Sequence, residues 1–274
     1  MYGKKLRMTR LVNPKSGKVC IVPIDHGATI GPVDGIREYL STIECINSGG
    51  ADAVVLHKGL LKKVAQCPEL GKGQYILHLS VSTKQSPYPD YKVLIGSVEE
   101  AVKLGADGVS VHVNLGVENE AEMLKDLGRV ASASFEWGIP LLAMMYSFKS
   151  NREAYDIAHA ARLAEELGAD IVKVAYPGSI KSMEHIVKSV SIPVIIAGGN
   201  KMNSGQELLY MISDALSGGA AGVAIGRNIF EHRDPLLMTT LIRKFVHGEI
   251  KLQECLDRLE KTESARSRNL ELQF

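Results

Sequence analysis

One short pattern recurs along the 274-residue chain and constrains its fold more than any other feature. A glycine closes a helical pattern, and a short run rich in Val and Ile follows within two to four residues. Such runs are typical of strands that are buried on both faces of a parallel sheet. The four copies are GGADAVVL (49–56), LGADGVSV (104–111), LGADIVKV (167–174) and GGAAGVAI (218–225).

Four further strand-sized apolar segments lie between these copies, at 19–27, 74–80, 139–146 and 192–199. Helical patterns separate most of them, for example at 98–104, 153–167, 183–190 and 204–217. Eight strand–helix units in this length predict an α/β fold, a single-domain (β/α)8 TIM barrel over about residues 17–247. One charged helix or tail is expected at about 248–274. An open doubly wound sheet is the alternative, but its GxGxxG fingerprint is absent from DHGATIGP.

Composition narrows the class of partner and the compartment. A formal net charge of +1 with scattered cations does not favour nucleic acid or a membrane surface. The four cysteines lie far apart without a CxxC pair, which favours a reducing cytoplasm over a disulfide scaffold. The start, MYGKKLRMTRLV, lacks the apolar stretch of a signal peptide, and no apolar run is long enough for a membrane helix.

Polar residues gather where the apolar strands end, which is the end of a barrel that carries active sites. The segment LGADIVKVAYPG contains the most unusual one, Lys173, in the middle of a strand. Because side chains alternate along a strand, Val172 and Val174 should pack outward and Lys173 should face the barrel axis. Desolvation there favours the neutral amine, a nucleophile that forms Schiff bases with carbonyls. An internal salt bridge to Asp25 is the alternative.

Two further residues are candidates for proton transfer. Alternation places Tyr146 on the inner face of the neighbouring strand, beside Lys173, where a phenol can shuttle protons. Asp25 ends the first strand and could act as a base or pair with Lys173. The simpler interpretations are a tyrosine that covers the core and an aspartate that caps the next turn.

Glycines end the seventh and eighth strands, where this fold usually binds phosphate. Gly198, Gly199 and Gly226 offer backbone N–H groups that can approach an anion closely, and Arg227 and Lys201 add positive charge. We therefore predict a phosphate site there.

Histidines near the ends of strands two to four allow a second kind of chemistry. His57, His78 and His112 could together hold zinc and polarise a carbonyl, although HxH and HExxH spacings are absent. We favour no metal. Histidines that bind substrate fit better, and we predict substrate contacts for His26, His112 and Lys58.

Several motifs occur in order at the predicted strand ends: VPIDHGATIGP, LHKG, VSVHVNLG, PLLAMMY, GADIVKVAYPG, VIIAGGNKM and GAAGVAIGRNIFEHRDP. They resemble the archaeal-type class I (Schiff-base) fructose-bisphosphate aldolase family over about residues 4–246. Within this family the chain is most similar to the 2-amino-3,7-dideoxy-D-threo-hept-6-ulosonate synthase branch.

The resemblance implies a role for each residue of these motifs. It assigns the Schiff base to Lys173, acid/base catalysis to Tyr146 and Asp25, and phosphate binding to the two glycine ends with Arg227. It also implies a homo-oligomer, often of pentameric rings or a decamer, without metal or organic cofactor.

One loop departs from the family pattern. Relatives usually read Pro-Arg-Gly after the tyrosine, whereas this chain reads Ser147-Phe148-Lys149. The change puts the fit of the substrate in doubt, although Lys149 could replace the charge. The segment 79–92 is similar to the synthase branch.

The resemblance leads to a ranked set of functions. First is an aldolase or transaldolase that joins a phosphorylated ketone, dihydroxyacetone phosphate or a deoxyketohexose phosphate, to an aldehyde such as L-aspartate semialdehyde. The product would be a C7 precursor of 3-dehydroquinate or of 3-amino-4-hydroxybenzoate. Fructose-1,6-bisphosphate aldolase is the alternative. A non-catalytic phosphate-binding barrel is the more remote one.

Overall fold

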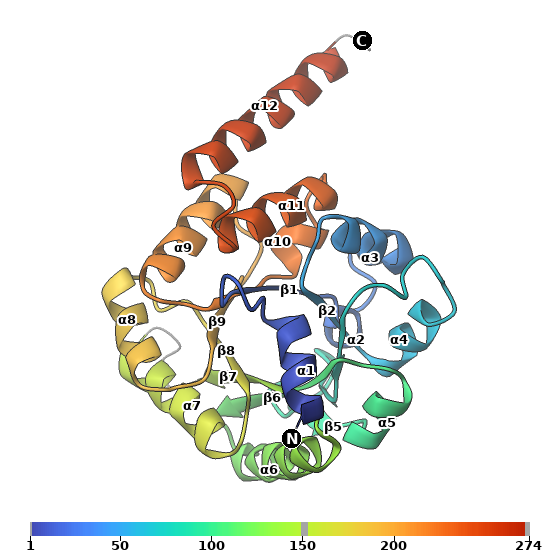
Figure 1. Ribbon diagram of the computed structural model, residues 1–274, viewed down its shortest axis with the longest axis vertical. Coiled ribbons are helices and arrows are strands. Elements are labelled where there is room, and N and C mark those ends of the chain that lie inside the picture. Colours follow the sequence, from blue (N-terminus) through green and yellow to red (C-terminus); the bar gives the residue numbers. More distant parts are fainter. Residues whose placement is uncertain (1, 149–152, 272–274) are drawn as a thin grey trace.

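The protein forms a closed barrel of eight parallel strands surrounded by helices (Figure 1). The computed structural model describes residues 2–148 and 153–271. Around the barrel the strands follow the order β1-β10-β9-β8-β7-β6-β3-β2. This confirms the predicted TIM barrel and excludes the open sheet. The barrel strands are β1 (Val19–Pro23), β2 (Ala53–Leu56), β3 (Tyr75–His78), β6 (Gly108–Leu115), β7 (Leu141–Ser147), β8 (Ile171–Val174), β9 (Val194–Ala197) and β10 (Gly222–Ala224).

Helices connect successive strands on the outside of the barrel. The helical patterns recognised in the sequence correspond to α5, α7, α8 and α9. The helices are α1 (Tyr2–Leu11), α2 (His26–Ile30), α3 (Tyr39–Ser48), α4 (Lys58–Val64), α5 (Val98–Lys103), α6 (Glu120–Trp137), α7 (Ala154–Glu166), α8 (Ile180–Lys188), α9 (Gly205–Ser217), α10 (Arg227–Phe230), α11 (Pro235–Val246) and α12 (Leu252–Glu271).

The strands divide the hydrophobic core into two layers. Ile171 belongs to the cluster inside the barrel, whereas Val172 and Val174 belong to the layer between the sheet and the helices. This alternation follows from the two-residue period of a strand. The predicted directions along β8 are therefore confirmed, and Lys173 lies on the inner face.

The aspartates of the recurring Gly-Ala-Asp segments fasten the strands at their N-terminal ends. Asp52 accepts a hydrogen bond from the N–H of Cys20 at 2.6 Å, and Asp170 accepts one from Leu141 at 2.8 Å. Asp107 does the same for Tyr75 at 3.2 Å. Each carboxylate thus satisfies the first free donor of the neighbouring strand. The fourth copy has alanine at this position.

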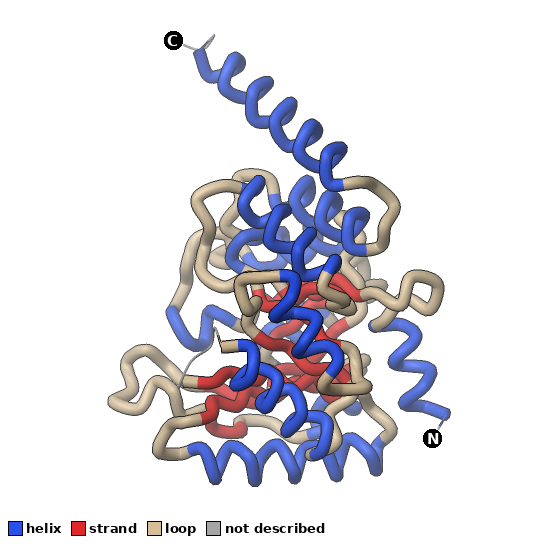
Figure 2. Tube along the Cα trace, turned by 90° about the vertical axis from the view of Figure 1, so that its left-hand side faces the viewer, coloured by secondary structure: helices blue, strands red, loops and turns tan. Residues whose placement is uncertain are grey.

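Two elements lie outside the predicted pattern of strand–helix units. Helix α1 lies across the N-terminal end of the barrel, where Leu11 joins the inner cluster (Figures 1 and 2). Between β3 and α5 the chain forms a two-stranded antiparallel hairpin, β4 (Ser80–Val81) with β5 (Val93–Leu94). The segment that joins these strands, 82–92, is part of the stretch that resembles the synthase branch.

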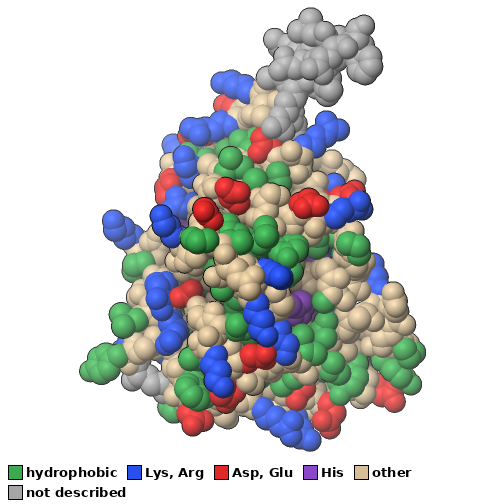
Figure 3. All heavy atoms as spheres, turned by 90° about the vertical axis from the view of Figure 1, so that its right-hand side faces the viewer, with side chains coloured by type: hydrophobic (Ala, Val, Ile, Leu, Met, Phe, Trp, Pro, Cys, Tyr) green, Lys and Arg blue, Asp and Glu red, His purple; other side chains and the backbone are tan. Residues whose placement is uncertain are grey.

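The C-terminal charged segment forms α12, as expected, and its first turns pack on α9 and α11 through buried Cys255 and Leu259. Beyond these contacts the helix extends away from the barrel (Figure 1). Within the described residues no helix is long and apolar enough to cross a membrane. Figure 3 shows Lys and Arg mixed with Asp and Glu on one face of the molecule, in line with the near-zero net charge.

Candidate active site

Lys173 lies inside the C-terminal half of the barrel and is only 7% exposed. Within residues 2–148 and 153–271 its ammonium makes no hydrogen bond and no ion pair within 4.0 Å. The internal salt bridge that the sequence left open is therefore not formed there. On the neighbouring strand Met144 lies directly beside it in the register. A buried amine without a protein partner lowers the stability of the fold. Such groups are typical of functional sites.

Asp25 follows β1 and occupies the N-cap position of α2, but its side chain makes no capping hydrogen bond. The capping interpretation is thus wrong. Its Oδ2 lies 3.6 Å from His78 Nε2, and its Oδ1 lies 3.4 Å from His26 Nδ1. The carboxylate is consequently directed toward the barrel end, where the inner strand residues converge.

The charges around Asp25 keep its carboxyl ionised. Burial alone would raise its pKa, but His78, His26 and Lys173 outweigh this effect and bring the pKa below its ordinary value. Burial lowers the pKa of His78 to about 4 against the pull of Asp25. At neutral pH this part of the site therefore combines a carboxylate with a neutral imidazole, which suits a cation on Lys173 or on an iminium formed from it.

Tyr146 is the next-to-last residue of β7, two residues beyond Met144, and packs against the inner cluster, as predicted. Its ring lies 4.8 Å from the ring of His112. His112 Nε2 lies 2.8 Å from Asn114 Oδ1, and burial lowers the His112 pKa to about 3, so this imidazole is neutral. Tyr146 therefore packs on a neutral aromatic partner from β6, and its predicted place beside Lys173 stays a prediction.

The loops after β9 and β10 meet as predicted for a phosphate site. Arg227 Nη2 donates to Gly199 O at 3.0 Å, and Arg227 Nε is buried without a partner. Gly199 has φ +67°, and its surroundings are open. A side chain at Gly226 would come within 2.6 Å of both Pro23 O and His26. Backbone conformation at Gly199 and close packing at Gly226 therefore already explain why glycine occupies these positions. Anion binding at Gly198, Gly199 and Gly226 stays a prediction.

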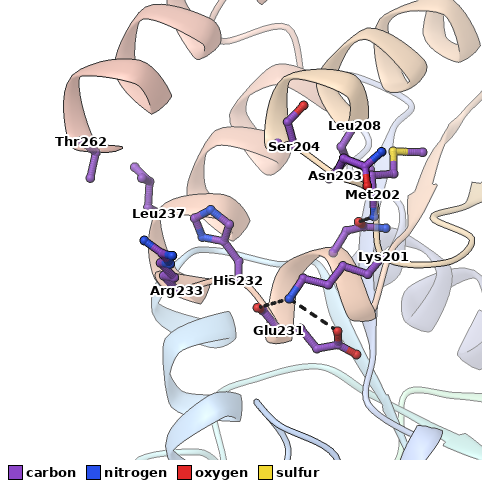
Figure 4. A pocket seen from close by; sticks show the side chains of 12 residues that line it. Lys201, Met202, Asn203, Ser204, Leu208, Glu231, His232, Arg233, Leu237 and Thr262 are labelled. Carbon is purple, nitrogen blue, oxygen red and sulfur yellow. Dashed lines mark hydrogen bonds and ion pairs between the residues drawn. The ribbon is translucent and has the colours of Figure 1, made fainter. Parts of the chain in front are cut away.

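Lys201 faces a different place from Arg227. Its ammonium donates to Glu231 O at 3.1 Å and lies 3.7 Å from the Glu231 carboxylate (Figure 4). It lines a cavity of about 500 Å³ between the start of α9, the α10–α11 turn and α12, together with His232 and Arg233. Its predicted contact with substrate phosphate stays a prediction.

Lys58 and His57 are held by contacts with neighbouring segments of the chain. Lys58 Nζ donates to Ile95 O at 2.6 Å and to Glu100 at 3.1 Å, so its charge is directed outward, and its substrate role stays a prediction. His57 Nδ1 lies 3.2 Å from His78 O. Across the two described ranges no three His, Cys, Asp or Glu side chains converge as metal ligands, so the zinc hypothesis lacks its ligand set.

The loop that differs from the family pattern, which begins at Ser147, lies partly outside the described residues. Ser147 is buried at the end of β7, and Phe148 is 48% exposed with its N–H donating to Leu115 O. Lys149, the proposed replacement for the family arginine, lies outside the described residues.

Sequence reasoning missed two polar residues at this barrel end. Ser110 Oγ lies 2.8 Å from His78 Nδ1 and fixes the ring that faces Asp25. Lys92 reaches the same end from the hairpin, and its charge acts on His112, His78 and Asp25. Ser110 could have been found from the inward alternation of β6, but nothing in the sequence placed Lys92.

A barrel with a buried lysine beside an ionised aspartate and a tyrosine at its C-terminal end has the arrangement of an enzyme that forms Schiff bases. The comparisons with known proteins give the class. The model of the DeoC/LacD family aldolases matches residues 19–232, and the chain belongs to this family. It is an aldolase-type enzyme, and the resemblance seen in the sequence is confirmed.

Relatives of this chain include two proteins named as synthases. The chain is 40% identical to the 2-amino-4,5-dihydroxy-6-oxo-7-(phosphonooxy)heptanoate synthase of Streptomyces griseus, covering 90% of this chain and 91% of the relative. It is 41% identical to the 2-amino-3,7-dideoxy-D-threo-hept-6-ulosonate synthase 1 of Archaeoglobus fulgidus, covering 94% and 96%. These relatives are similar over nearly their whole length.

Solved structures agree with this placement. The crystal structure of an archaeal fructose 1,6-bisphosphate aldolase has a TM-score of 0.81 at 29% identity, covering 89% of this chain and 99% of that chain. A second structure of an archaeal fructose-1,6-bisphosphate aldolase, with a TM-score of 0.81 at 28% identity, has the catalytic lysine covalently bound to the carbinolamine intermediate of the substrate. It covers 89% of this chain and 100% of that chain.

Proposed function

We propose that the protein joins a phosphorylated ketone to L-aspartate semialdehyde through a Schiff base on Lys173. One observation carries the proposal: Lys173 is buried at the catalytic end of the barrel without a hydrogen bond or ion pair in the described chain. A related aldolase has been seen with its lysine bound covalently to a carbinolamine, which is the first intermediate of this chemistry.

The first half of the reaction makes the carbon nucleophile. Lys173 Nζ adds as a free amine to the ketone carbon and forms a carbinolamine. Tyr146 protonates the carbinolamine hydroxyl, which leaves as water, and an iminium remains. The phenolate of Tyr146 then removes a proton from the adjacent carbon to give an enamine. Asp25 stays ionised beside these cations and lowers their energy.

The second half makes the carbon–carbon bond. The enamine attacks the aldehyde carbon while Tyr146 returns its proton to the aldehyde oxygen. The iminium that results takes up water, and the water's proton passes to Tyr146. Collapse of the carbinolamine releases the ketone product and the free amine of Lys173. The buried position of Lys173 keeps bulk water from these intermediates.

The names of the relatives define the substrates that we propose. The product of the Streptomyces griseus synthase has an amino acid at one end and a phosphorylated hydroxyketone at the other. Breaking its aldol bond between C4 and C5 gives aspartate semialdehyde and dihydroxyacetone phosphate. The ulosonate made by the Archaeoglobus fulgidus enzyme lacks oxygen at C7 and therefore needs a deoxyketone unit from another donor.

A donor panel tests the proposal. The full chain is incubated with L-aspartate semialdehyde and either dihydroxyacetone phosphate or a deoxyketohexose phosphate, and the products are read by mass spectrometry. A seven-carbon amino acid that retains phosphate supports the first pairing, and one without phosphate supports the second. Absence of both products with wild-type protein would refute the proposal.

Fructose-1,6-bisphosphate aldolase is the second candidate, because the chain is 32% identical to the class 1 enzyme of Thermoproteus tenax. Rapid cleavage of fructose 1,6-bisphosphate without use of L-aspartate semialdehyde would favour it. The intact set of Lys173, Tyr146 and Asp25 argues against a non-catalytic barrel. The predicted homo-oligomer, the predicted cytoplasmic location and the choice between the two C7 pathways stay predictions.

A further inference from the structure

The hairpin between β3 and α5 is a separate element on the catalytic end of the barrel, outside the repeating strand–helix pattern. It is fastened to the end of β6. Asn114 Nδ2 donates to Asp90 O at 2.7 Å, and the N–H of His112 donates to Ser80 Oγ at 2.9 Å. Because His112 also packs on Tyr146, the hairpin is held beside the residue proposed to transfer protons.

Lys92 lies on this hairpin with its charge incompletely paired. Its ammonium donates to Ser82 Oγ and, at 3.4 Å, to Pro89 O. Ser82 is buried and donates in turn to Pro89 O at 2.6 Å, so the two acceptors fix the position of the Lys92 ammonium. In the described part of the chain no carboxylate lies within 4.0 Å of the Lys92 ammonium. An ammonium has three N–H donors, so one remains for a ligand.

The charge of Lys92 acts on titratable groups of the site. Burial lowers its pKa, and Asp90 and Asp25 oppose this change. After burial itself, Lys92 is the largest cause of the lowered pKa of His112, and it also acts on His78. The contacts of Ser80 with His112 and of Asn114 with Asp90 hold the hairpin that carries Lys92 beside these groups.

The order of the barrel strands places Lys92 opposite the predicted phosphate site. The hairpin lies over β3 and β6, whereas Gly198 and Arg227 follow β9 and β10. Four steps around an eight-stranded barrel separate β10 from β6, and β8 with Lys173 lies midway. A substrate that crosses this end of the barrel would thus meet positive charge at both of its ends. Arg227 would lie at one end, Lys92 at the other, and Lys173 between them.

We propose that Lys92 binds the carboxylate of the aldehyde acceptor and selects acceptors that carry one. This inference rests on the proposed function. The product of the Streptomyces griseus relative has phosphate at C7, a ketone at C6 and a carboxylate at C1, in the same order as Arg227, Lys173 and Lys92 across the barrel. A single ammonium opposite the phosphate rim suits an ω-aldehyde of an amino acid.

Direct binding of an unreactive analogue tests the inference without turnover. The probe is L-homoserine, in which a CH2OH group replaces the aldehyde of aspartate semialdehyde, and 3-aminopropan-1-ol is the same molecule without the carboxylate. Calorimetric titrations are made with the full chain, with and without saturating dihydroxyacetone phosphate. We expect wild-type protein to prefer L-homoserine at least about tenfold, as a charge-assisted hydrogen bond provides.

Three variants make the result specific. Lys92→Met should abolish the preference, and Lys92→Arg should keep most of it. Lys84→Met removes an exposed lysine of the same hairpin and should behave as wild type. A preference that survives in Lys92→Met, or that is absent from wild-type protein under both conditions, overturns the inference.

Borohydride trapping of the ketone on Lys173, run on the same preparations, keeps this test distinct from that of the proposed function. If the ketone is trapped on Lys173 in both wild type and Lys92→Met, and both prefer L-homoserine equally, the proposed reaction is supported and the role of Lys92 is refuted. A preference that depends on Lys92, without any trapping, supports the carboxylate subsite and refutes the reaction.

Discussion

The two ends of the barrel differ in whether their buried polar groups have hydrogen-bond partners. At the N-terminal end Asp52 accepts from Cys20 N–H and from His247 Nε2, at 2.6 and 2.8 Å, and His247 Nδ1 in turn lies 2.8 Å from Ser16 Oγ. At the C-terminal end Arg227 Nε is buried without a hydrogen-bond partner, and His26 Nδ1 makes no hydrogen bond although Asp25 Oδ1 lies 3.4 Å away. Lys173, at the same end, has no partner in the described chain.

This contrast indicates which end maintains the fold and which end reacts. Buried polar groups that satisfy one another contribute to stability, whereas those left without partners cost free energy and persist where a ligand will meet them. The same strands carry both ends, so substitutions at each end should separate stability from activity. The predictions below test this separation.

The largest effect is expected for Lys173→Met at the catalytic end. Loss of the nucleophile should reduce kcat by more than about 10³-fold. Because an apolar side chain replaces a buried ammonium, thermal stability should stay equal or increase. Steady-state rates and a calorimetric melting curve measure both. Wild-type activity in this variant would contradict the assigned mechanism, and Lys181→Met on the exposed part of α8 is the matched control.

The next effect is expected for Asp52→Ala at the N-terminal end. The change leaves Cys20 N–H and the His247 side chain, which is only 2% exposed, without their acceptor. Unfolding free energy should fall by about 3 kcal/mol, with kcat at 25 °C nearly unchanged. Urea denaturation measures the loss. Asp34→Ala, which breaks an exposed pair with Arg37, should cost almost nothing.

Acid should destabilise the protein through the catalytic end. Burial lowers the pKa of His78 from 6.5 to about 4 and that of His112 to about 3. Between these values and pH 6.5 the unfolded chain binds protons that the folded chain does not, so stability falls as pH falls. Each imidazole contributes up to about 1.4 kcal/mol per pH unit.

Urea midpoints at pH 6.5 and pH 5 for wild type and for His112→Gln measure this slope. The variant should lose part of the pH dependence, whatever its stability at pH 6.5. His159→Gln, at an exposed position of α7, should keep the wild-type slope. An identical slope in wild type and His112→Gln would show that the acid sensitivity arises elsewhere.

The smallest effect is expected for Arg227→Lys. A lysine keeps the positive charge but loses the planar fork that contacts Gly199 O and presents the buried Nε. KM for a phosphorylated ketone should rise about threefold to tenfold while kcat changes little. An unchanged KM would move the phosphate site away from the loops after β9 and β10.

The periodic part of the molecule could be predicted from the sequence. Glycine-terminated helices and apolar runs located the barrel strands, and two-residue alternation gave the direction of Lys173 and Tyr146. These features depend on local chemistry. Some strands were predicted too long, as at residues 19–27, where β1 ends at Pro23 and Asp25 is already the N-cap of the next helix.

The rest depends on contacts between distant segments. The hairpin strands β4 and β5 have two residues each and exist because they dock on β6, so their sequence carries almost no signal. The same is true of the long side chains at this end. Lys58 pairs with Glu100, Lys201 pairs with Glu231, and Lys92 binds Ser82, and only the folded positions of these partners decide this.

Borohydride trapping with peptide mapping tests the central role of Lys173 most directly. The full chain is reduced in the presence of dihydroxyacetone phosphate, fructose 1,6-bisphosphate or a deoxyketohexose phosphate, each with and without EDTA. We predict a stable adduct on Lys173 that is insensitive to EDTA, and the donor that forms it identifies the ketone substrate. No adduct on Lys173 with any donor, together with activity that is lost in EDTA, would contradict the Schiff-base account.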